Sequence, residues 1–176
     1  MPTATAPSPG PLAVVVMGVS GSGKTTVGEL LAEALGAEFV EGDNLHTDAA
    51  REKMRSGLAL TDDDRWPWLD RIAAALAAGP PRGVVVACSA LRRVYRDRLR
   101  SEVGPRLRFV YLKATPDLMR ERVGSRRGHY MPASLVESQF ATLEPPLNEG
   151  DVLTAPADMD LETEIPKLAA RLSPRA

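Results

Sequence analysis

The sequence predicts an α/β fold of three layers, in which a parallel sheet of about five strands has helices on both faces. Residues 12–17 and 83–87 are apolar without alternation, which is typical of strands buried on both faces of a parallel sheet. Amphipathic helical segments separate the strand-like segments along the chain. We expect one domain over residues 12–176, preceded by a disordered leader at residues 1–11, which is rich in Pro, Thr, Ala and Ser.

The other elements alternate as such a fold requires. Thr47 is the expected cap of a polar helix that ends near Gly57. Asp63 or Asp64 is the expected cap of the next helix, which places Pro67 in its first turn. Strands are expected at residues 12–17, 38–41, 83–87, 107–112 and 151–154. Helices are expected at residues 24–35, 47–57, 64–78, 91–101, from 116 onward, 134–142 and 161–172.

Charge and composition narrow the class of ligand. The 22 basic and 23 acidic residues nearly cancel, which disfavours nucleic acid or an anionic membrane as partner. Basic residues cluster at 92–108, with seven arginines against two acidic residues, and at 120–127, with four against one. These clusters suit a small polyanionic ligand. The single cysteine, Cys88, is an expected core residue and indicates a reducing, cytoplasmic setting, and no apolar run is long enough to span a membrane.

A glycine-rich motif follows the first strand and opens the first helix. The pattern G-x-x-x-x-G-K-[ST] in this context is a phosphate-binding P-loop, whose backbone N–H groups surround the phosphates of a nucleotide. Lys24 is the candidate for the β- and γ-phosphates, and Thr25 is a candidate Mg²⁺ ligand. The motif predicts ATP and Mg²⁺ as cofactors. The nucleotide-binding candidates here are Gly18, Val19, Ser20, Gly21, Ser22, Gly23, Lys24, Thr25 and Thr26.

The motif's surroundings favour a small-metabolite kinase over a switch GTPase or a motor. The strand at residues 83–87 lacks the terminal Asp of such proteins and ends in Cys88-Ser89-Ala90, and no Asn-Lys-x-Asp motif is present. Asp43 follows the second strand and is a candidate to activate or orient the acceptor hydroxyl. A small mobile lid is expected at about residues 122–133. The catalytic candidates are Lys24, Asp43 and Arg126, and Arg122 and Arg126 are candidates to bind the nucleotide.

Several further segments resemble those of gluconokinases, which belong to the shikimate-kinase-like group of P-loop kinases. The resemblance extends from Val14 to about Leu153. It implies ATP-dependent phosphorylation of D-gluconate at its 6-hydroxyl to give 6-phospho-D-gluconate, by a homodimer. Beyond the P-loop it depends on Glu41-Gly42-Asp43-Asn44-Leu45-His46, Lys53-Met54-Arg55-Ser56-Gly57, Leu60-Thr61-Asp62-Asp63-Asp64-Arg65-Trp66-Pro67-Trp68-Leu69, Cys88-Ser89-Ala90-Leu91, Tyr95-Arg96-Asp97, Tyr111-Leu112 and Arg127-Gly128-His129-Tyr130.

Candidates for the substrate site each have a simpler structural alternative. The two histidines lie in the resembling segments, where they bind substrate or hydrogen-bond a loop. Arg51 and Arg55 share a helix face that holds a carboxylate or is merely solvated. Arg92 and Arg96 share another face, next to the end of a central strand. The substrate candidates are Asp43, His46, Arg51, Arg55, Arg92, Arg96 and His129.

Three further assignments remain open at this stage. Ser89 is a candidate to hold Mg²⁺ through water or to cap the next helix. The run Asp62-Asp63-Asp64 is interpreted as complementing a helix dipole rather than binding a metal. Arg122 and residues 155–157 are the candidate adenine site. The alternatives to a gluconokinase are another small-metabolite kinase, of shikimate or nucleotide type, and a non-catalytic nucleotide-binding regulator.

Overall fold

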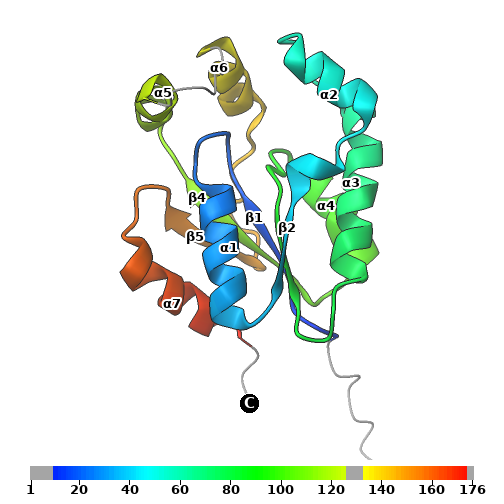
Figure 1. Ribbon diagram of the computed structural model, residues 1–176, viewed down its shortest axis with the longest axis vertical. Coiled ribbons are helices and arrows are strands. Elements are labelled where there is room, and N and C mark those ends of the chain that lie inside the picture. The colour runs from blue at the N-terminus through cyan, green and yellow to red at the C-terminus, as the bar shows by residue number, and fades with distance from the viewer. Residues whose placement is uncertain (1–9, 126–132, 174–176) are drawn as a thin grey trace, which may run out of the picture.

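The structure, a computed structural model, describes residues 10–125 and 133–173. It contains a five-stranded parallel sheet in the order β2-β3-β1-β4-β5, so the three-layer α/β prediction is confirmed (Figure 1). The strands are β1 (Ala13–Met17), β2 (Glu38–Glu41), β3 (Val84–Ala87), β4 (Leu107–Lys113) and β5 (Val152–Pro156). The helices within the described ranges are α1 (Lys24–Leu35), α2 (Asp48–Arg55), α3 (Asp62–Ala77), α4 (Arg93–Val103), α5 (Pro116–Ser125), α6 (Ala133–Thr142) and α7 (Leu161–Leu172).

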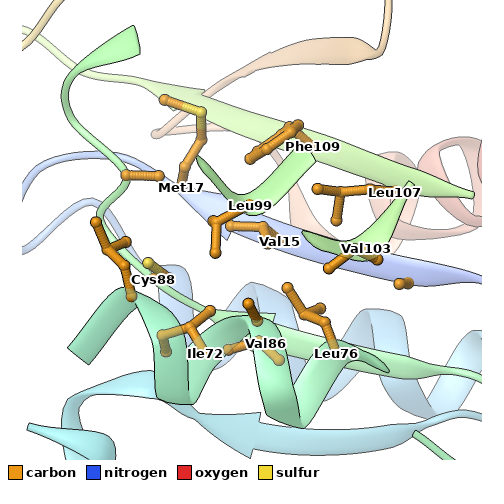
Figure 2. Close-up of a cluster of buried hydrophobic side chains, with 14 of the residues drawn as sticks. Val15, Met17, Ile72, Leu76, Val86, Cys88, Leu99, Val103, Leu107 and Phe109 are labelled. Atoms are coloured by element: carbon orange, nitrogen blue, oxygen red, sulfur yellow. The ribbon is translucent and has the colours of Figure 1, made fainter. Parts of the chain in front are cut away.

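Side chains on the two faces of the sheet form two separate cores. Val15 and Met17 of β1 point into the core beneath α3 and α4, which Figure 2 shows. Val14 and Val16 point to the other face and pack against α1 and α7. Because successive strand residues point to opposite faces, a strand between two cores is apolar at every position. This explains why β1 and β3 show no alternation in the sequence.

The helices that pack on the two faces of the sheet do not cover the carboxyl ends of its strands. In Figure 1, α5 and α6 lie on one side beyond the carboxyl ends of the strands, and α2 lies on the other. The segment from β1 to α1 emerges between them at this end of the sheet. In open parallel sheets, ligands bind beyond the carboxyl ends of the strands, so the topology places the candidate site here.

The start of α3 differs from the prediction. Its cap is Thr61, whose hydroxyl accepts a hydrogen bond from the Asp64 backbone N–H, while the Asp64 carboxylate accepts one from the Thr61 N–H. This reciprocal capping box places Asp62 at the first helical position, so the prediction of Asp63 or Asp64 as cap is wrong. Pro67 consequently lies in the second turn of the helix rather than in the first.

The predicted leader and lid lie largely outside the described residues. Of the leader at residues 1–11 only the last two are described, and of the lid at residues 122–133 the structure omits 126–132. The candidate residues Arg126 and His129 therefore lie outside the described residues. Their assignments stay predictions.

Candidate active site

The P-loop connects β1 to α1 in a conformation that only glycine tolerates at several positions. Gly21 and Gly23 have φ values of 83° and 97°, in the left-handed region. A Cβ on Gly18 would lie 2.9 Å from the Ser22 Oγ and 3.1 Å from the Leu112 carbonyl oxygen. The Gly18 N–H donates to the Ser89 carbonyl oxygen at 3.2 Å. The loop is thereby tied to the end of β3.

Lys24 and Thr25, the last residues of the motif, lie at the start of α1 and reach in different directions. The Lys24 Nζ donates to the Val19 carbonyl oxygen at 3.0 Å, so its charge lies back over the loop. The Thr25 hydroxyl donates to the Glu41 carboxylate at the end of β2. The other Glu41 oxygen accepts from the Asp43 backbone N–H at 3.3 Å. Glu41 thus connects the P-loop to Asp43, the predicted catalytic carboxylate.

Glu41 is a candidate site residue that the sequence analysis missed. The sequence could have identified Glu41, because an acidic residue at the last position of β2 lies at the same end of the sheet as the P-loop. Gly42, between the two acids, packs so closely against β3 that a Cβ would lie 2.1 Å from the Ala87 carbonyl oxygen. The tight passage places Glu41 and Asp43 at the end of β3.

Cys88 lies among these charged groups but is a core residue, as expected. Its side chain is buried, and burial raises the pKa of the thiol to about 12. The negative charges of Asp43 and Glu41 raise that pKa as well, and the positive charge of Lys24 lowers it. A thiol with so high a pKa is not a nucleophile at neutral pH.

His46 is buried at the end of the 3₁₀ turn η1 (Gly42–Leu45), which carries Asp43. Its ring stacks on Trp68 with centroids 4.2 Å apart and planes 13° from parallel, and the Trp68 indole N–H donates to the Gly42 carbonyl at 2.8 Å. Burial, together with the positive charges of Arg51 and Arg65, lowers the pKa of His46 to about 4. The ring is therefore neutral at physiological pH, and its buried Nδ1 has no hydrogen-bond partner among the described residues.

The depressed pKa of His46 predicts a pH-dependent stability. Between pH 6.5 and about 4 the unfolded chain binds a proton at this residue while the folded chain does not. The free energy of unfolding should therefore decrease as the pH is lowered through this range, by about 1.4 kcal/mol per pH unit from this residue alone. Urea unfolding of the wild type and of His46→Phe, which keeps a ring beside Trp68, measures this from pH 7.5 to 4.5. Parallel curves for the two proteins would contradict the assignment.

The α2 arginines do not act as a pair. Arg51 donates to the Asn44 carbonyl oxygen and so turns toward the 3₁₀ turn that carries Asp43. Arg55 instead has a side chain that is 74% exposed and lies 3.4 Å from Glu52 in a surface ion pair. The structure thus brings Arg51 to the site and leaves Arg55 at the solvated face.

Arg92 lies in a network at the start of α4. It donates to Asp62 at 2.5 Å and to Glu144 at 3.1 Å, and these hydrogen bonds raise its pKa. Tyr95 also donates to Asp62, which lowers the pKa of that carboxyl, and Arg65 donates to the Tyr95 oxygen at 2.7 Å. The first acid of the Asp62-Asp63-Asp64 run is therefore an ion-pair partner.

Asp64 has a structural role as well. It completes the capping box at the start of α3 and pairs with Lys53 at 2.7 Å. Among the described residues, no group of three or more His, Cys, Asp or Glu side chains is arranged to hold a metal ion.

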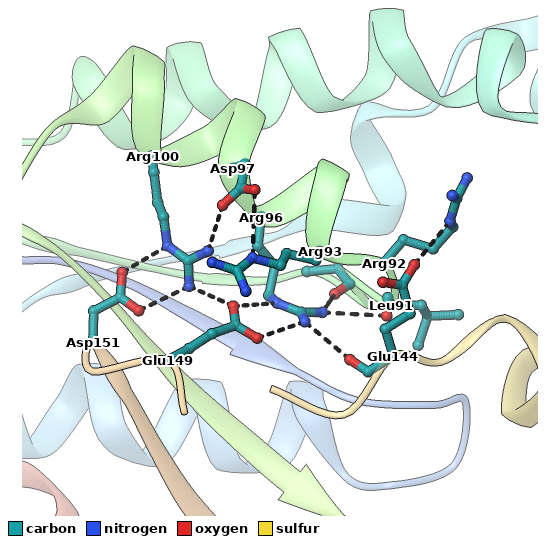
Figure 3. A network of polar contacts seen from close by, with 10 residues as sticks. Leu91, Arg92, Arg93, Arg96, Asp97, Arg100, Glu144, Glu149 and Asp151 are labelled. Carbon is teal, nitrogen blue, oxygen red and sulfur yellow. Dashed lines mark hydrogen bonds and ion pairs between the residues drawn. The ribbon is translucent and has the colours of Figure 1, made fainter. Parts of the chain in front are cut away.

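Arg96 was predicted to bind substrate, and the structure corrects this. Its side chain is fully buried, and all five N–H donors bind protein acceptors (Figure 3). Two of these bonds go to the Glu149 carboxylate at 2.8 and 2.9 Å. The other three go to the carbonyl oxygens of Ala90, Leu91 and Glu144 at 2.8, 3.2 and 2.9 Å. Arg96 holds the segment after β3 against the segment after α6.

We expect the loss of the Arg96–Glu149 ion pair to have a large effect on the stability of the protein. The Glu149 side chain is 3% exposed and also accepts from Arg100 at 2.7 Å. Because a buried pair that loses one partner leaves a desolvated charge, Glu149→Gln should lower the free energy of unfolding by about 3 kcal/mol. Asp117→Asn breaks the exposed Arg120–Asp117 pair and should change it by less than about 0.5 kcal/mol. Urea denaturation of both variants measures the contrast, and equal effects would contradict it.

A pocket of about 370 Å³ lies beside the P-loop, between α1, α5 and the segment before α7. Arg122 forms part of its wall and donates to the Gly21 carbonyl at 3.0 Å and to the Ala157 carbonyl at 2.8 Å. The structure therefore brings Arg122 together with the late loop, as the predicted adenine site requires. The residues that line it are Gly21, Ser22, Gly23, Thr26, Val27, Arg122, Ala157, Asp158, Met159 and Leu161.

The parallel sheet, the P-loop and the carboxylates at the end of β2 define a P-loop kinase. A family model described as AAA domain matches residues 14–146. A probable gluconokinase of Schizosaccharomyces pombe is 49% identical over 148 residues, which cover 80% of this chain and 77% of that one. A gluconokinase of Gluconobacter oxydans is 48% identical over 147 residues, which cover 81% of each chain.

Solved structures agree with these relatives. A gluconokinase of Sinorhizobium meliloti has a TM-score of 0.82 and 47% identity, with coverage of 93% of this chain and 91% of that one. A shikimate kinase of Aquifex aeolicus has a TM-score of 0.55 at 17% identity, covering 92% and 96%, which supports the fold alone. The chain belongs to the gluconokinase family. None of its described helices combines the length and the hydrophobicity that crossing a membrane requires.

Proposed function

We propose that the protein transfers the γ-phosphoryl group of ATP to the 6-hydroxyl of D-gluconate, which gives 6-phospho-D-gluconate and ADP. The observation that carries this is the connection from Thr25 of the P-loop through Glu41 to Asp43. This connection supports the proposal, because the exposed Asp43 follows the strand end that Thr25 contacts, and we assign the acceptor hydroxyl to its neighbourhood. The names of the relatives supply the identity of the acceptor.

The proposed roles follow from what each group offers chemically. Asp43 accepts the proton of the attacking hydroxyl or orients that hydroxyl toward the γ-phosphorus. Lys24 stabilises the charge that develops on the transferred group, and the P-loop N–H groups bind the remaining phosphate oxygens. Arg126, as a further cation near the phosphates, stays part of the proposal.

The oxygens of Thr25 and Glu41 fit a magnesium ion. A hydroxyl and a carboxylate that share a hydrogen bond supply the hard oxygen ligands that Mg²⁺ prefers, together with phosphate oxygens and water. When bound, the ion neutralises charge on the β- and γ-phosphates. Ser89, whose carbonyl accepts from Gly18, remains a candidate for a contact through water.

Gluconate is a polyol with one carboxylate, and its proposed contacts lie around the 3₁₀ turn. The neutral His46 ring has an unpartnered Nδ1 that suits a hydroxyl, and Arg51 is the nearby cation for the carboxylate. Arg92 and His129 stay in the proposal. We also propose a homodimer, from the resemblance, and a cytoplasmic location, from the single cysteine.

A substrate panel tests the proposal. ADP release is measured with ATP, Mg²⁺ and gluconate, shikimate, AMP or CMP in turn. Release that depends on gluconate, and 6-phosphogluconate as product, would support the assignment. Activity confined to another acceptor would favour the alternative kinase. Tight ATP binding without turnover on any acceptor would favour a nucleotide-binding regulator.

A further inference from the structure

A side chain from α6 contacts the P-loop at Ser20. The Ser20 backbone N–H donates to the Gln139 Oε1 at 2.5 Å, and the Gln139 Nε2 donates to the Ser20 Oγ at 2.8 Å. The two residues are 119 positions apart in the sequence. This reciprocal pair has no role in the mechanism above, and neither the motif nor the charge pattern predicts it.

The pair determines where the Ser20 hydroxyl proton can point. A backbone N–H only donates, so the amide atom that it meets must be the Gln139 oxygen. The other amide atom is then the nitrogen, which only donates as well, so the Ser20 Oγ is its acceptor. The hydroxyl proton cannot point at a donor and must therefore point away from Gln139. Ser20 is left with an oriented O–H that can serve as a hydrogen-bond donor.

Ser20 lies at the terminal-phosphate end of the loop. The Lys24 ammonium, which reaches the β- and γ-phosphates in such motifs, lies 3.0 Å from the carbonyl oxygen of Val19, the residue before Ser20. The pocket proposed for the base is lined by Gly21, Ser22 and Gly23 but not by Ser20. We therefore expect the phosphate chain of a nucleotide in that pocket to extend toward Ser20.

Helix α6 is held firmly enough to set this geometry. Val136, one turn before Gln139, is buried in a cluster with Val19 of the P-loop, Leu91 and Met119. After the helix, the Glu144 N–H donates to the Leu91 carbonyl at 2.8 Å. The apolar contact and the backbone bond fix α6 on both sides of Gln139.

We propose that Gln139 is a positioning residue, which orients the Ser20 hydroxyl as a donor to the terminal phosphoryl group of the bound nucleotide. A role of this donor in catalysis depends on the proposed phosphoryl transfer, whereas its main measurable effect is on nucleotide affinity alone. A triphosphate presents the γ-oxygens that the hydroxyl reaches, and a diphosphate does not. Loss of Gln139 should therefore weaken the triphosphate selectively.

Calorimetric titration with ADP and with the β,γ-imido analogue of ATP, both with Mg²⁺, tests this. Gln139→Leu keeps the side-chain volume and removes both hydrogen bonds. It should weaken the analogue about 3- to 10-fold, the value of one neutral hydrogen bond, and leave ADP affinity within about twofold. Gln139→Glu should weaken the analogue more, because its carboxylate accepts the Ser20 proton and repels the phosphate. Glu137→Gln, exposed on the same helix, is the matched control and should change neither affinity.

Ser20→Ala completes a double-mutant cycle with Gln139→Leu. Both single variants should lose similar analogue affinity, and the double variant should lose little more. With gluconate as acceptor, kcat should fall while the KM for gluconate stays unchanged. Equal weakening of ADP and analogue would mean that Gln139 only supports the loop, and would overturn the proposal, as would no weakening of either. Because these titrations need no acceptor, they are independent of the substrate panel.

Discussion

Asp43→Asn is expected to lower kcat with gluconate by about 100- to 10,000-fold, which is the contribution of a well-placed general base. Asparagine keeps the shape of the side chain and cannot accept the proton. The Glu41 contact to the backbone N–H at position 43 does not involve the Asp43 side chain, so the 3₁₀ turn should be preserved. Nucleotide binding should be unchanged, because Asp43 is assigned to the acceptor rather than to the phosphates.

Steady-state ADP release gives kcat and KM, and ADP titration gives the nucleotide affinity. Asp48→Asn, an exposed carboxylate at the start of α2, is the matched control and should keep wild-type kinetics. Retention of full kcat in Asp43→Asn would remove the catalytic assignment while leaving the P-loop assignment untouched. A rise in KM with unchanged kcat would instead make Asp43 a binding residue only.

Most of the fold could be predicted from the sequence, because the local residue pattern of each element matches the burial that the tertiary structure gives it. The run at residues 12–17 is apolar throughout, and the sheet buries it on both faces between two cores. The P-loop was predictable for the same reason, because its glycines, flanking strand and following helix must occur together. The cap of α3 was mispredicted because several consecutive polar residues can each serve as a cap. The backbone conformation of the folded chain determines that Thr61 is the cap.

The arginines were less predictable, because spacing reveals a shared helix face but not what lies opposite it. Arg92 and Arg96 were expected to share a helix face, but Arg92 is the N-cap of α4 with an extended backbone, and Arg96 is paired with Glu149, 53 residues later in the chain. The contact from Gln139 to Ser20 depends on where α6 packs against Val19. Such long-range partners need the tertiary structure. Glu41 was different, since a search for acids at strand ends would have found it.

The removal of the P-loop cation gives the second large effect. Lys24→Ala should lower kcat by about 100- to 1,000-fold, because one preorganised charge no longer stabilises the transferred phosphoryl group. Lys24→Arg should not restore the rate. Its planar guanidinium is larger than an ammonium and cannot replace a point charge 3.0 Å from the Val19 carbonyl inside a tight loop.

Single-turnover and steady-state measurements of ADP formation test this prediction. Lys167→Ala is the matched control, since that lysine is on α7 with its side chain 63% exposed and paired with Glu164. It should keep both kcat and thermal stability. Wild-type kcat together with wild-type nucleotide affinity in Lys24→Ala would contradict the assignment of Lys24 to the γ-phosphate. A loss confined to nucleotide affinity would mean that Lys24 stabilises bound ATP and the transition state equally, because only a contact stronger in the transition state raises kcat.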